Sequence, residues 1–371
     1  MSRRLRVLQL IDNLNYGGME RVLADLVRRL AQDRYECHVL GLTYLGQFAE
    51  GLESSAGLHV AEPMSSRSML WPRSLAGQIR RIGPDVVHSH SGVWYKGSLA
   101  ARLAGVRRLI HTDHGRPQPD PWAGRLLERI AAARTDVIVA VSEPLADLLV
   151  HRVGVNRAKL VVVHNGVDTD THRPRPDAGR VRRELGLSPD TPVLGSIGRL
   201  EPIKGYDIML EAFGRLWGNW SQEPRPVLVI AGDGSEQAKL AALADRIGFS
   251  DGIRLLGWRD DVAELHATFN LFTLASRSEG TSISLLEAMS AGLCPVVTDV
   301  GGNAGVLGPK LAHRLVRPND PDALAAAWRA ALQSADARCR DAEAARQRVL
   351  ASFGLDTMVT AYESLYLGAH S

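Results

Sequence analysis

The strongest chemical signal in the chain is the segment EGTSISLLEAMSAG at residues 279–292, in which seven residues separate two glutamates. Its Gly-Thr-Ser triplet stands where a loop is expected to become a helix, so that free N–H groups and the positive helix end can bind an anion. Glu287 follows about 9 Å further along that helix, roughly the reach from a diphosphate to its sugar. We expect Glu287 on ribose hydroxyls and Glu279 on a second sugar; the alternative is a capped helix with two solvated glutamates.

The segment GRLEPIKG at residues 198–205 follows an apolar run that is typical of a buried strand. It places Arg199 and Lys204 at the strand's carboxyl end, around a turn interrupted by Pro202. Two cations there can converge on a diphosphate and neutralise the charge that develops as a phosphate leaving group departs. A surface loop with two solvated bases is the alternative, but a single site would need both this pair and the glutamates.

The first half of the chain gives weaker signals. Gly17 and Gly18 follow the first apolar run and open a helical pattern, so a ligand could approach their backbone closely. His114 lies in HTDHG, residues 111–115, at an expected strand end. It could hydrogen-bond a sugar hydroxyl or a departing phosphate oxygen. A structural glycine pair and a loop histidine without a role are the alternatives.

Four histidines at two expected strand ends raise the question of a metal ion: His88, His90, His111 and His114. No His-x₃-His or Cys-x₂-Cys spacing accompanies them, and the two glutamates lie in the other half, so the sequence disfavours a metal. The turn GDGSE lacks the third glycine of the dinucleotide fingerprint, which disfavours a nicotinamide cofactor. The usual motifs of ATPases, serine hydrolases and zinc proteases are also missing. We therefore expect neither a metal nor an organic cofactor.

The elements that must position these residues alternate regularly along the chain. Apolar runs of strand length, beginning at residues 5–11, are each followed by a helical pattern or a glycine-rich turn. The segment at residues 172–180 concentrates proline and charge and predicts a linker. We therefore predict an α/β fold with two Rossmann-like doubly wound domains, residues 1–172 and 173–354, facing across a cleft. Ligands of such sheets bind at the carboxyl ends of the strands.

Length and composition limit the classes of protein that remain. A chain of 371 residues with 45% hydrophobic and 23% charged residues is typical of a globular protein of two domains. Three scattered cysteines fit a reducing cytoplasm, and we expect neither a secretory signal nor a membrane-spanning helix. The net charge of +3 is too small to predict a nucleic-acid partner. Arginines cluster in the first half, which indicates a solvated basic surface or a face that meets an anionic membrane or acceptor.

Taken together, these motifs resemble those of glycosyltransferase family four, the retaining family with the GT-B fold. The resemblance runs through nearly the whole chain. It is carried, in the family's order, by YGGMERVL (16–23), DVVHSHS (85–91), HTDHG (111–115), VSE (141–143), HNGVD (164–168), GRLEPIKG (198–205), GDGSE (232–236), LLGWRDDV (255–262) and the two-glutamate segment.

The resemblance implies a hexosyltransferase that moves a sugar from a nucleoside diphosphate sugar to a hydroxyl of a glycan, lipid-linked or small-molecule acceptor. UDP sugars are favoured over GDP-mannose, and cell-surface polysaccharide or glycolipid synthesis is the expected role. The first domain, completed by a last helix at residues 355–371, would bind the acceptor, and the second the donor. The implied catalytic residues are His114, Arg199, Lys204 and Glu279. The implied substrate-binding residues are Gly17, Gly18, Arg199, Lys204, Gly280, Thr281, Ser282 and Glu287. The family needs no metal, and we expect a cytoplasmic protein that could attach to the inner membrane face.

Two segments depart from the family's pattern. The turn GGNAG at residues 301–305 has no glutamate at its end, and His313 and Arg314 stand where Asn-Gly is usual. We expect both segments toward the rim of the donor domain, where they would affect the choice of donor sugar. A nucleotide-sugar 2-epimerase of the same architecture and a non-catalytic sugar-nucleotide-binding scaffold are the rival interpretations.

Overall fold

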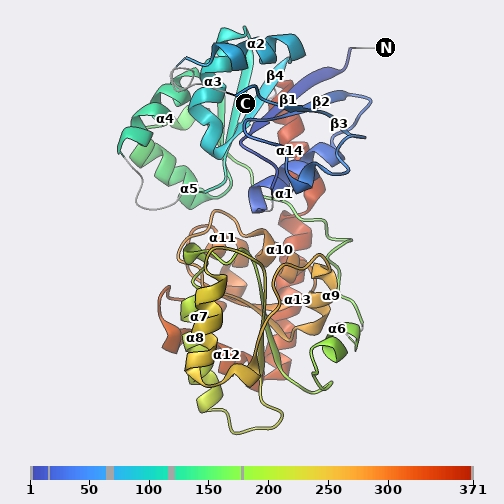
Figure 1. The fold of residues 1–371 in the computed structure, drawn as a ribbon, viewed down its shortest axis with the longest axis vertical. Helices are drawn as coiled ribbons and strands as arrows, with labels where there is room; N and C mark the ends of the chain where they lie inside the picture. The colour runs from blue at the N-terminus through green and yellow to red at the C-terminus, as the bar shows by residue number, and fades with distance from the viewer. Residues whose placement is uncertain (1–2, 16, 64–70, 116–121, 177–178, 369–371) are drawn as a thin grey trace. The chain divides into compact units, whose positions relative to one another are not determined.

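The computed structural model describes residues 3–15, 17–63, 71–115, 122–176 and 179–368. The chain divides into two compact units, of which the first comprises Met1–Gly166 with Leu355–Ser371 and the second Val167–Gly354 (Figure 1). Each unit is a parallel β-sheet with helices on both faces. Two Rossmann-like units of this kind confirm the predicted α/β class.

The described residues of the first unit form a seven-stranded parallel sheet in the order β3-β2-β1-β4-β5-β6-β7. Its strands are β1 (Leu5–Ile11), β2 (Tyr35–Gly41), β3 (Ala56–Val60), β4 (Val86–His90), β5 (Arg108–Asp113), β6 (Val137–Ala140) and β7 (Leu160–Val162). The interior strand β1 is nearly continuous in apolar residues, as expected where helices cover both faces of a strand. Gln9 interrupts this apolar run and is nonetheless completely buried.

Helices cover both faces of this sheet. They are α1 (Gly18–Arg29), α2 (Arg73–Ile82), α3 (Trp94–Leu103), α4 (Trp122–Arg134), α5 (Glu143–Leu148) and α14 (Leu355–Leu367), with the short turns η1 (Gln47–Ala49), η3 (Ser91–Val93), η4 (Leu149–Val153) and η5 (Arg157–Lys159). The last helix, α14, packs beside α1, although the two are at opposite ends of the sequence (Figure 1). An ion pair of 2.6 Å between Arg34 and Glu363 helps to hold α14 there.

The described residues of the second unit form a six-stranded parallel sheet in the order β10-β9-β8-β11-β12-β13. Its strands are β8 (Val193–Ile197), β9 (Val227–Ala231), β10 (Ile253–Leu255), β11 (Leu271–Leu274), β12 (Cys294–Thr298) and β13 (Leu315–Val316). Its helices are α6 (Gly179–Glu184), α7 (Tyr206–Gly218), α8 (Gln237–Ile247), α9 (Val262–Thr268), α10 (Ile283–Ser290), α11 (Asn303–Leu307), α12 (Pro321–Gln333) and α13 (Ala335–Ser352), with the turns η6 (Pro202–Lys204), η7 (Ser250–Gly252) and η8 (Pro309–Arg314).

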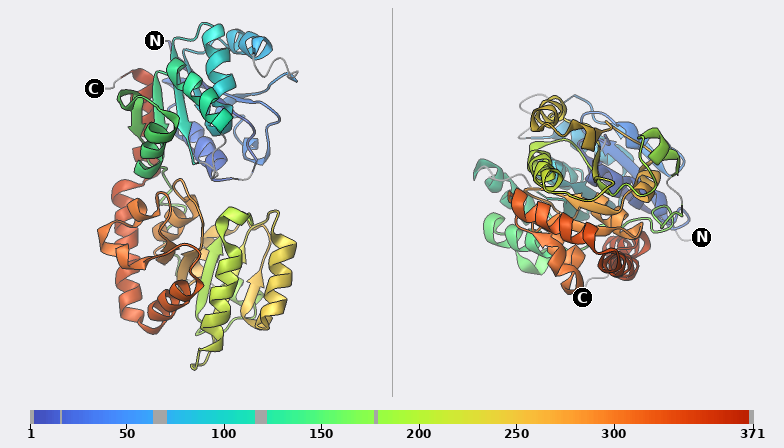
Figure 2. Two further views of the ribbon diagram at one scale, coloured as in Figure 1. Left: turned by 90° about the vertical axis from the view of Figure 1, so that its left-hand side faces the viewer. Right: turned by 90° about the horizontal axis from the view of Figure 1, so that it is seen from below.

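Two hydrophobic cores lie on the two faces of this second sheet. Helices α7, α8 and α12 pack against one face, where α7 and α8 run side by side (Figure 2). Helices α6, α9, α10, α11 and α13 supply the core on the other face. The helix that carries Glu287, α10, is therefore held between the sheet and α13.

The chain enters and leaves the second unit at neighbouring positions. The N–H of Val167 donates to the carbonyl of Phe353 at 2.9 Å, and Val167 forms a parallel bridge with Gly354. Residues 167–172 consequently pack with the second unit, whereas the predicted boundary left them in the first. This pairing across the chain could not be inferred from local composition.

Candidate active site

The loop that carries the two cations begins directly after β8 and is fixed by the loop that follows β9. Leu200 donates its N–H to the carbonyl of Asp233 at 2.9 Å. A Cβ at Gly232 would lie 1.9 Å from the carbonyl oxygen of Gly198. The backbone of Gly232 also has φ +149°, which side chains rarely adopt, so both the backbone conformation and the lack of space exclude a side chain there. The glycine turn therefore supports the cation loop through close backbone packing.

Lys204 and Glu279, which are far apart in sequence, form a close ion pair. Lys204 Nζ lies 2.7 Å from Glu279 Oε1, and the two side chains are 17% and 7% exposed. The hydroxyl of Ser276 donates to the same carboxylate oxygen at 2.6 Å. The structure thus brings together two of the predicted catalytic residues, with the carboxylate held by two donors.

Contacts between the loops that precede α7 and α10 produce this pairing. The N–H of Arg277 donates to the carbonyl of Ile203 at 2.8 Å, and its guanidinium donates to Asp207 at 2.7 Å. Gly205 has φ +65°, and a Cβ there would lie 2.1 Å from the carbonyl oxygen of Ala275. The two loops therefore pack against each other at the carboxyl ends of β8 and β11.

Arg199, the second predicted cation, does not join this pair. Its side chain is exposed and forms no hydrogen bond or ion pair with any residue that the structure describes. Its charge helps to lower the pKa of Glu201, although the hydrogen bonds from the Ser235 hydroxyl and N–H contribute more. Arg199 is therefore available to an anionic ligand near the helical turn that ends at Lys204.

The Gly280-Thr281-Ser282 triplet leads into α10 as predicted from the sequence. Ser282 is the N-cap, and its hydroxyl accepts a hydrogen bond from the N–H of Leu285 at 3.4 Å. Thr281 and Ser282 are both buried, at 7% and 4% exposure. The helix start thus combines a capping side chain with backbone N–H groups near the Lys204–Glu279 pair.

The GGNAG turn was expected at the rim of the domain, and this expectation is wrong. The N–H of Gly302 donates to the carbonyl of Gly280 at 2.9 Å. A Cβ at Gly301, where φ is +53°, would lie 1.7 Å from the carbonyl oxygen of Glu279. The turn therefore packs directly on the backbone of the predicted sugar-binding loop, because Gly301 permits an approach that a side chain would prevent.

Glu287 lies within α10, five residues after its N-cap Ser282, and is largely buried, with 11% of its side chain exposed. His172 Nε2 lies 3.3 Å from Glu287 Oε1. Sequence analysis missed this histidine because it falls in a proline-rich, charged segment that was interpreted as a linker. The available signal was only that a histidine follows the HNGVD motif closely.

In the first unit, Gly17 and Gly18 stand at the start of α1. Gly17 is the N-cap of that helix, with extended backbone. A Cβ at Gly17 would lie 2.1 Å from a carboxylate oxygen of Glu20. The glycine thus makes room for an acidic side chain in the first helical turn, where the helix dipole favours negative charge.

His114 follows β5 and begins a chain of hydrogen bonds into the core of the first unit. Its Nε2 lies 3.0 Å from His90 Nδ1, and His90 Nε2 lies 2.9 Å from the amide oxygen of Gln9. Gln9 donates its amide N–H to the hydroxyl of Tyr366 on α14 at 3.0 Å. Because the amide oxygen only accepts, His90 carries its proton on Nε2 and accepts from His114 Nε2–H at Nδ1.

Burial keeps these imidazoles neutral. It lowers the pKa of His114 and of His88 to about 3, and it lowers the pKa of His90 well below its ordinary value. A neutral His114 with its proton on Nε2 retains a lone pair on Nδ1. That nitrogen has no hydrogen-bond partner among the described residues. In this tautomer it accepts a hydrogen bond from a hydroxyl and cannot donate one to a phosphate oxygen.

The four histidines of the DVVHSHS and HTDHG motifs do not form a metal site. His88 contacts the hydroxyls of Tyr366 and Thr112 at 2.9 and 2.7 Å, and the ring of His111 stacks on Trp94 with centroids 4.1 Å apart. Within the described ranges, no group of three or more potential metal ligands is close enough to hold an ion.

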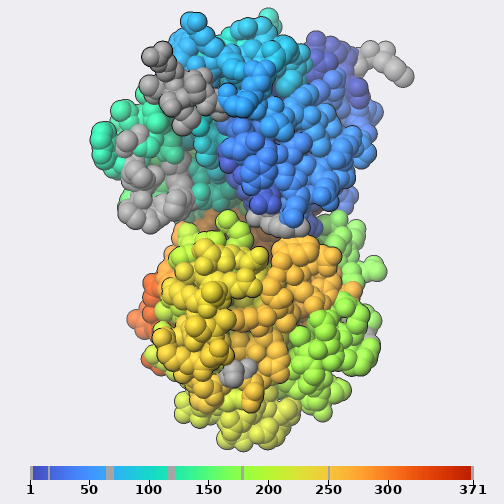
Figure 3. Space-filling model, viewed as in Figure 1, coloured from blue at the N-terminus to red at the C-terminus, as the bar shows by residue number. Residues whose placement is uncertain are grey.

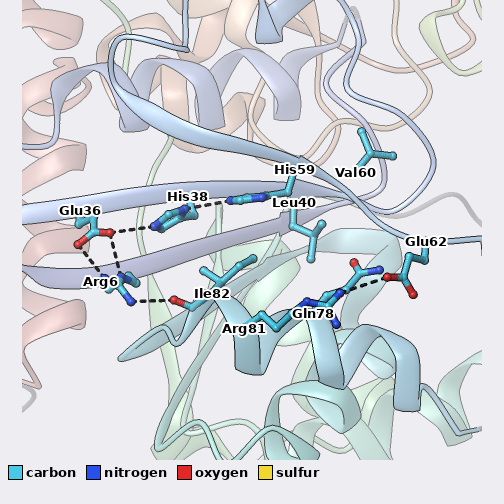
Figure 4. Close-up of a pocket in the computed structure, with 10 residues that line it drawn as sticks. All are labelled: Arg6, Glu36, His38, Leu40, His59, Val60, Glu62, Gln78, Arg81 and Ile82. Carbon is cyan, nitrogen blue, oxygen red and sulfur yellow. Dashed lines mark hydrogen bonds and ion pairs between the residues drawn. The ribbon is translucent and has the colours of Figure 1, made fainter.

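A separate polar hollow of about 450 Å³ lies beside β2, β3 and α2 (Figure 4). Arg6, Glu36, His38 and His59 form a chain of contacts along one wall. None of the residues predicted from the sequence lines this hollow. It is therefore distinct from the candidate active site.

Comparison with known proteins gives the class. Residues 16–171 match the family described as Glycosyltransferase Family 4, and residues 177–348 match Glycosyl transferases group 1. Together the two matches span most of the chain. With two Rossmann-like units, they define a glycosyltransferase of the GT-B fold class. The chain belongs to the group 1 glycosyltransferases, with an amino-terminal domain of family 4, and this confirms the resemblance that its motifs indicated.

Individual relatives and solved structures agree with this class. The Escherichia coli UDP-Gal:alpha-D-GlcNAc-diphosphoundecaprenol alpha-1,3-galactosyltransferase is 30% identical over 259 residues, 67% of this chain and 66% of that enzyme. The Bacillus anthracis N-acetyl-alpha-D-glucosaminyl L-malate synthase is 27% identical over 363 residues, 94% and 93% of the two chains. The Anabaena protein HepE, solved with UDP and glucose, superposes with a TM-score of 0.86 at 21% identity, covering 99% of this chain and 100% of that one.

Proposed function

We propose that this glycosyltransferase transfers a hexose, with retention of configuration, from a UDP sugar to a hydroxyl of a glycan or lipid-linked acceptor. The observation that carries the proposal is the group formed by Lys204, Glu279 and the start of α10. It combines a cation, a carboxylate and the N–H groups of a helix start within one unit, as a sugar diphosphate requires. The choice of UDP rests on the names of relatives, since the E. coli enzyme is named for UDP-Gal and HepE was solved with UDP.

In this proposal, each residue has a defined role toward the donor. Arg199 and Lys204 neutralise the diphosphate as it departs, and the N–H groups at the start of α10 contact phosphate and sugar. Glu287 accepts hydrogen bonds from the ribose hydroxyls, and Glu279 contacts the transferred sugar. His114 accepts from a sugar hydroxyl at Nδ1, and Gly18 marks the approach of the donor phosphate to the first unit. The two protein cations supply the charge, so the reaction needs no metal.

Retention follows from attack on the same face that the diphosphate leaves. The first-unit motifs do not point to a carboxylate nucleophile, so we propose front-face attack by the acceptor hydroxyl through an oxocarbenium-like transition state. The acceptor proton then passes to the departing phosphate oxygen. Polysaccharide or glycolipid assembly in the cytoplasm is the proposed setting, with no nucleic-acid partner.

A surface on α4 supports peripheral contact with an anionic membrane. Trp122, Leu126 and Leu127 are 74%, 53% and 37% exposed, and Arg125 and Arg129 lie on the same helix. Exposed apolar side chains next to arginines are typical of an interfacial helix. The residues of α4 lie at the surface of the first unit (Figure 3). Among the residues that the structure describes, no helix is both long and apolar enough to cross a membrane.

The donor assignment is tested by binding and turnover without metal. Thermal shift with UDP, GDP and their common sugars should show stabilisation by UDP in the wild type and none in Glu287→Ala. Turnover should consume donor only when an acceptor is present. Consumption without acceptor and with isomerised sugar would instead indicate an epimerase, and binding without any reaction would indicate a scaffold.

Membrane attachment is tested separately by flotation with vesicles that contain anionic lipid. The wild type should float at low salt, and the double variant Trp122→Ser/Leu126→Ser should stay in the soluble fraction. If both proteins stay in the soluble fraction, the proposal of membrane contact is wrong.

A further inference from the structure

His172 makes a buried contact with the residue proposed to bind ribose. Its Nε2 lies 3.3 Å from Glu287 Oε1, and the two side chains are 4% and 11% exposed. A carboxylate so far removed from water needs polar partners, because burial of a charge without them is strongly unfavourable. His172 provides such a partner from outside α10.

The backbone around His172 is fixed on both sides. Asp168 accepts hydrogen bonds from the N–H groups of Asp170 and Thr171, both at 3.0 Å, and its carbonyl accepts from the N–H of His172 at 3.0 Å. Beyond it, Pro174 packs against Gly292 at the end of α10, where an added Cβ would lie 3.2 Å from the proline ring. The segment is therefore built onto α10, and its histidine is held at a defined place along that helix.

A second buried histidine, His266, lies beside His172 and provides a control for its role. The ring of His266 lies 5.9 Å from the ring of His172, near Phe269 and Phe272. Burial, followed by the charge of His172, lowers the pKa of His266 to about 3, so His266 stays neutral. Its two ring nitrogens have no hydrogen-bond partner among the described residues. Of these two rings, the one that contacts Glu287 is that of His172.

We propose that His172 is a positioning residue that holds the Glu287 carboxylate in the orientation that binds the ribose hydroxyls of the donor. The proposal rests on the donor site proposed above. By occupying one side of Oε1, His172 limits rotation of the carboxylate. The remaining lone pairs of the carboxylate are then directed to the two ribose hydroxyls.

The contact itself is tested in the ligand-free protein by a double-mutant cycle. Unfolding constants are measured for the wild type, His172→Phe, Glu287→Gln and the double variant. Because the residues interact directly, the effect of the double substitution on the unfolding constant should differ from the product of the two single effects by about fivefold or more. If the effect of the double substitution equals the product of the two single effects within about twofold, His172 does not hold Glu287 and the proposal is overturned.

The role of the contact is tested by calorimetric titration with UDP. His172→Phe keeps a ring but loses the polar contact, and its Kd for UDP should rise roughly five- to tenfold. His172→Gln keeps an N–H donor and should restore the Kd to within about twofold of the wild type. The control His266→Phe should leave the Kd unchanged and should raise thermal stability, because it removes buried unpartnered nitrogens.

The outcomes distinguish this proposal from the donor assignment. If the cycle shows coupling but His172→Phe binds UDP as tightly as the wild type, the pair is structural and the positioning role is overturned. An equal loss of affinity in His172→Phe and His266→Phe would also overturn it, since the effect would then be one of packing. If the wild type binds neither UDP nor GDP, the donor assignment fails, and the role of His172 in donor binding fails with it.

Discussion

Lys204 Nζ lies 2.7 Å from Glu279 Oε1, and this pair links the loop after β8 to the loop before α10. The same oxygen of Glu279 accepts a hydrogen bond from the Ser276 hydroxyl at 2.6 Å. A lysine proposed to bind phosphate and a glutamate proposed to bind sugar thus organise one another. Their mutual contact places both groups near the helix start where the donor is expected to bind.

Removing one member of this pair should destabilise the protein more than removing both. Lys204→Ala leaves a largely buried carboxylate with one donor fewer, and we expect a loss of about 2 kcal/mol in the free energy of unfolding, because the lysine retains some exposure. The double variant Lys204→Ala/Glu279→Gln removes the unpaired charge and should recover part of this loss. Chemical denaturation measures both. Equal losses in the single and double variants would show that the unpaired carboxylate does not destabilise the protein.

Substitutions of the two cations should differ in their effect on stability, but both should lower the rate of catalysis. Because Arg199 is exposed and unpaired among the described residues, Arg199→Ala should change the free energy of unfolding by less than about 0.5 kcal/mol. Lys204→Ala should lower kcat by roughly 10²–10³, since it removes charge opposite the leaving group, and Arg199→Ala should also lower it. Steady-state rates with the donor found by thermal shift test this. Full turnover in Lys204→Ala, with an intact fold, would contradict the assignment.

Stability should fall as the pH decreases below about 6.5. Burial lowers the pKa of His88 and His266 to about 3 in the folded protein, whereas an unfolded chain has imidazole pKa values near 6.5. Between these values the unfolded state binds more protons, so the stabilisation is complete above pH 6.5 and is lost toward pH 3. Each histidine contributes up to about 1.4 kcal/mol per pH unit.

Denaturation curves between pH 7.5 and 4.5 measure this dependence. His266→Phe should reduce its slope, because one of the buried groups no longer takes up a proton on unfolding. A slope that is identical in the wild type and in this variant would contradict the assignment for His266.

The sequence predicted the elements and the class of enzyme better than it predicted the contacts between side chains. The strand-and-helix alternation and the helix start at Ser282 are local properties, and the structure has them where they were expected. The contact of His172 with Glu287 depends on how a segment after the first unit folds back onto α10, and composition indicated only a linker. Gln9 gave no chemical signal either, since its role depends on His90 and on Tyr366 from the far end of the chain.

The GGNAG turn provides a prediction with a matched control inside five residues. A Cβ at Gly301 would lie 1.7 Å from the carbonyl oxygen of Glu279, whereas a Cβ at Gly305 would meet nothing within 4 Å. Gly301 also has φ +53°, a conformation that alanine adopts only with strain of about 1–2 kcal/mol. Gly301→Ala should therefore displace the Glu279 loop, destabilise the protein and weaken donor binding.

Gly305→Ala should have the opposite effect on stability. Gly305 lies within α11, where alanine favours the helix by up to about 1 kcal/mol, so this variant should be equally or more stable and should bind donor as the wild type does. Melting temperatures and nucleotide titrations of the two variants decide the point. If Gly301→Ala bound donor normally, the turn would not support the Glu279 loop. The departure of the GGNAG turn from the family's pattern would then not affect the donor sugar through this loop.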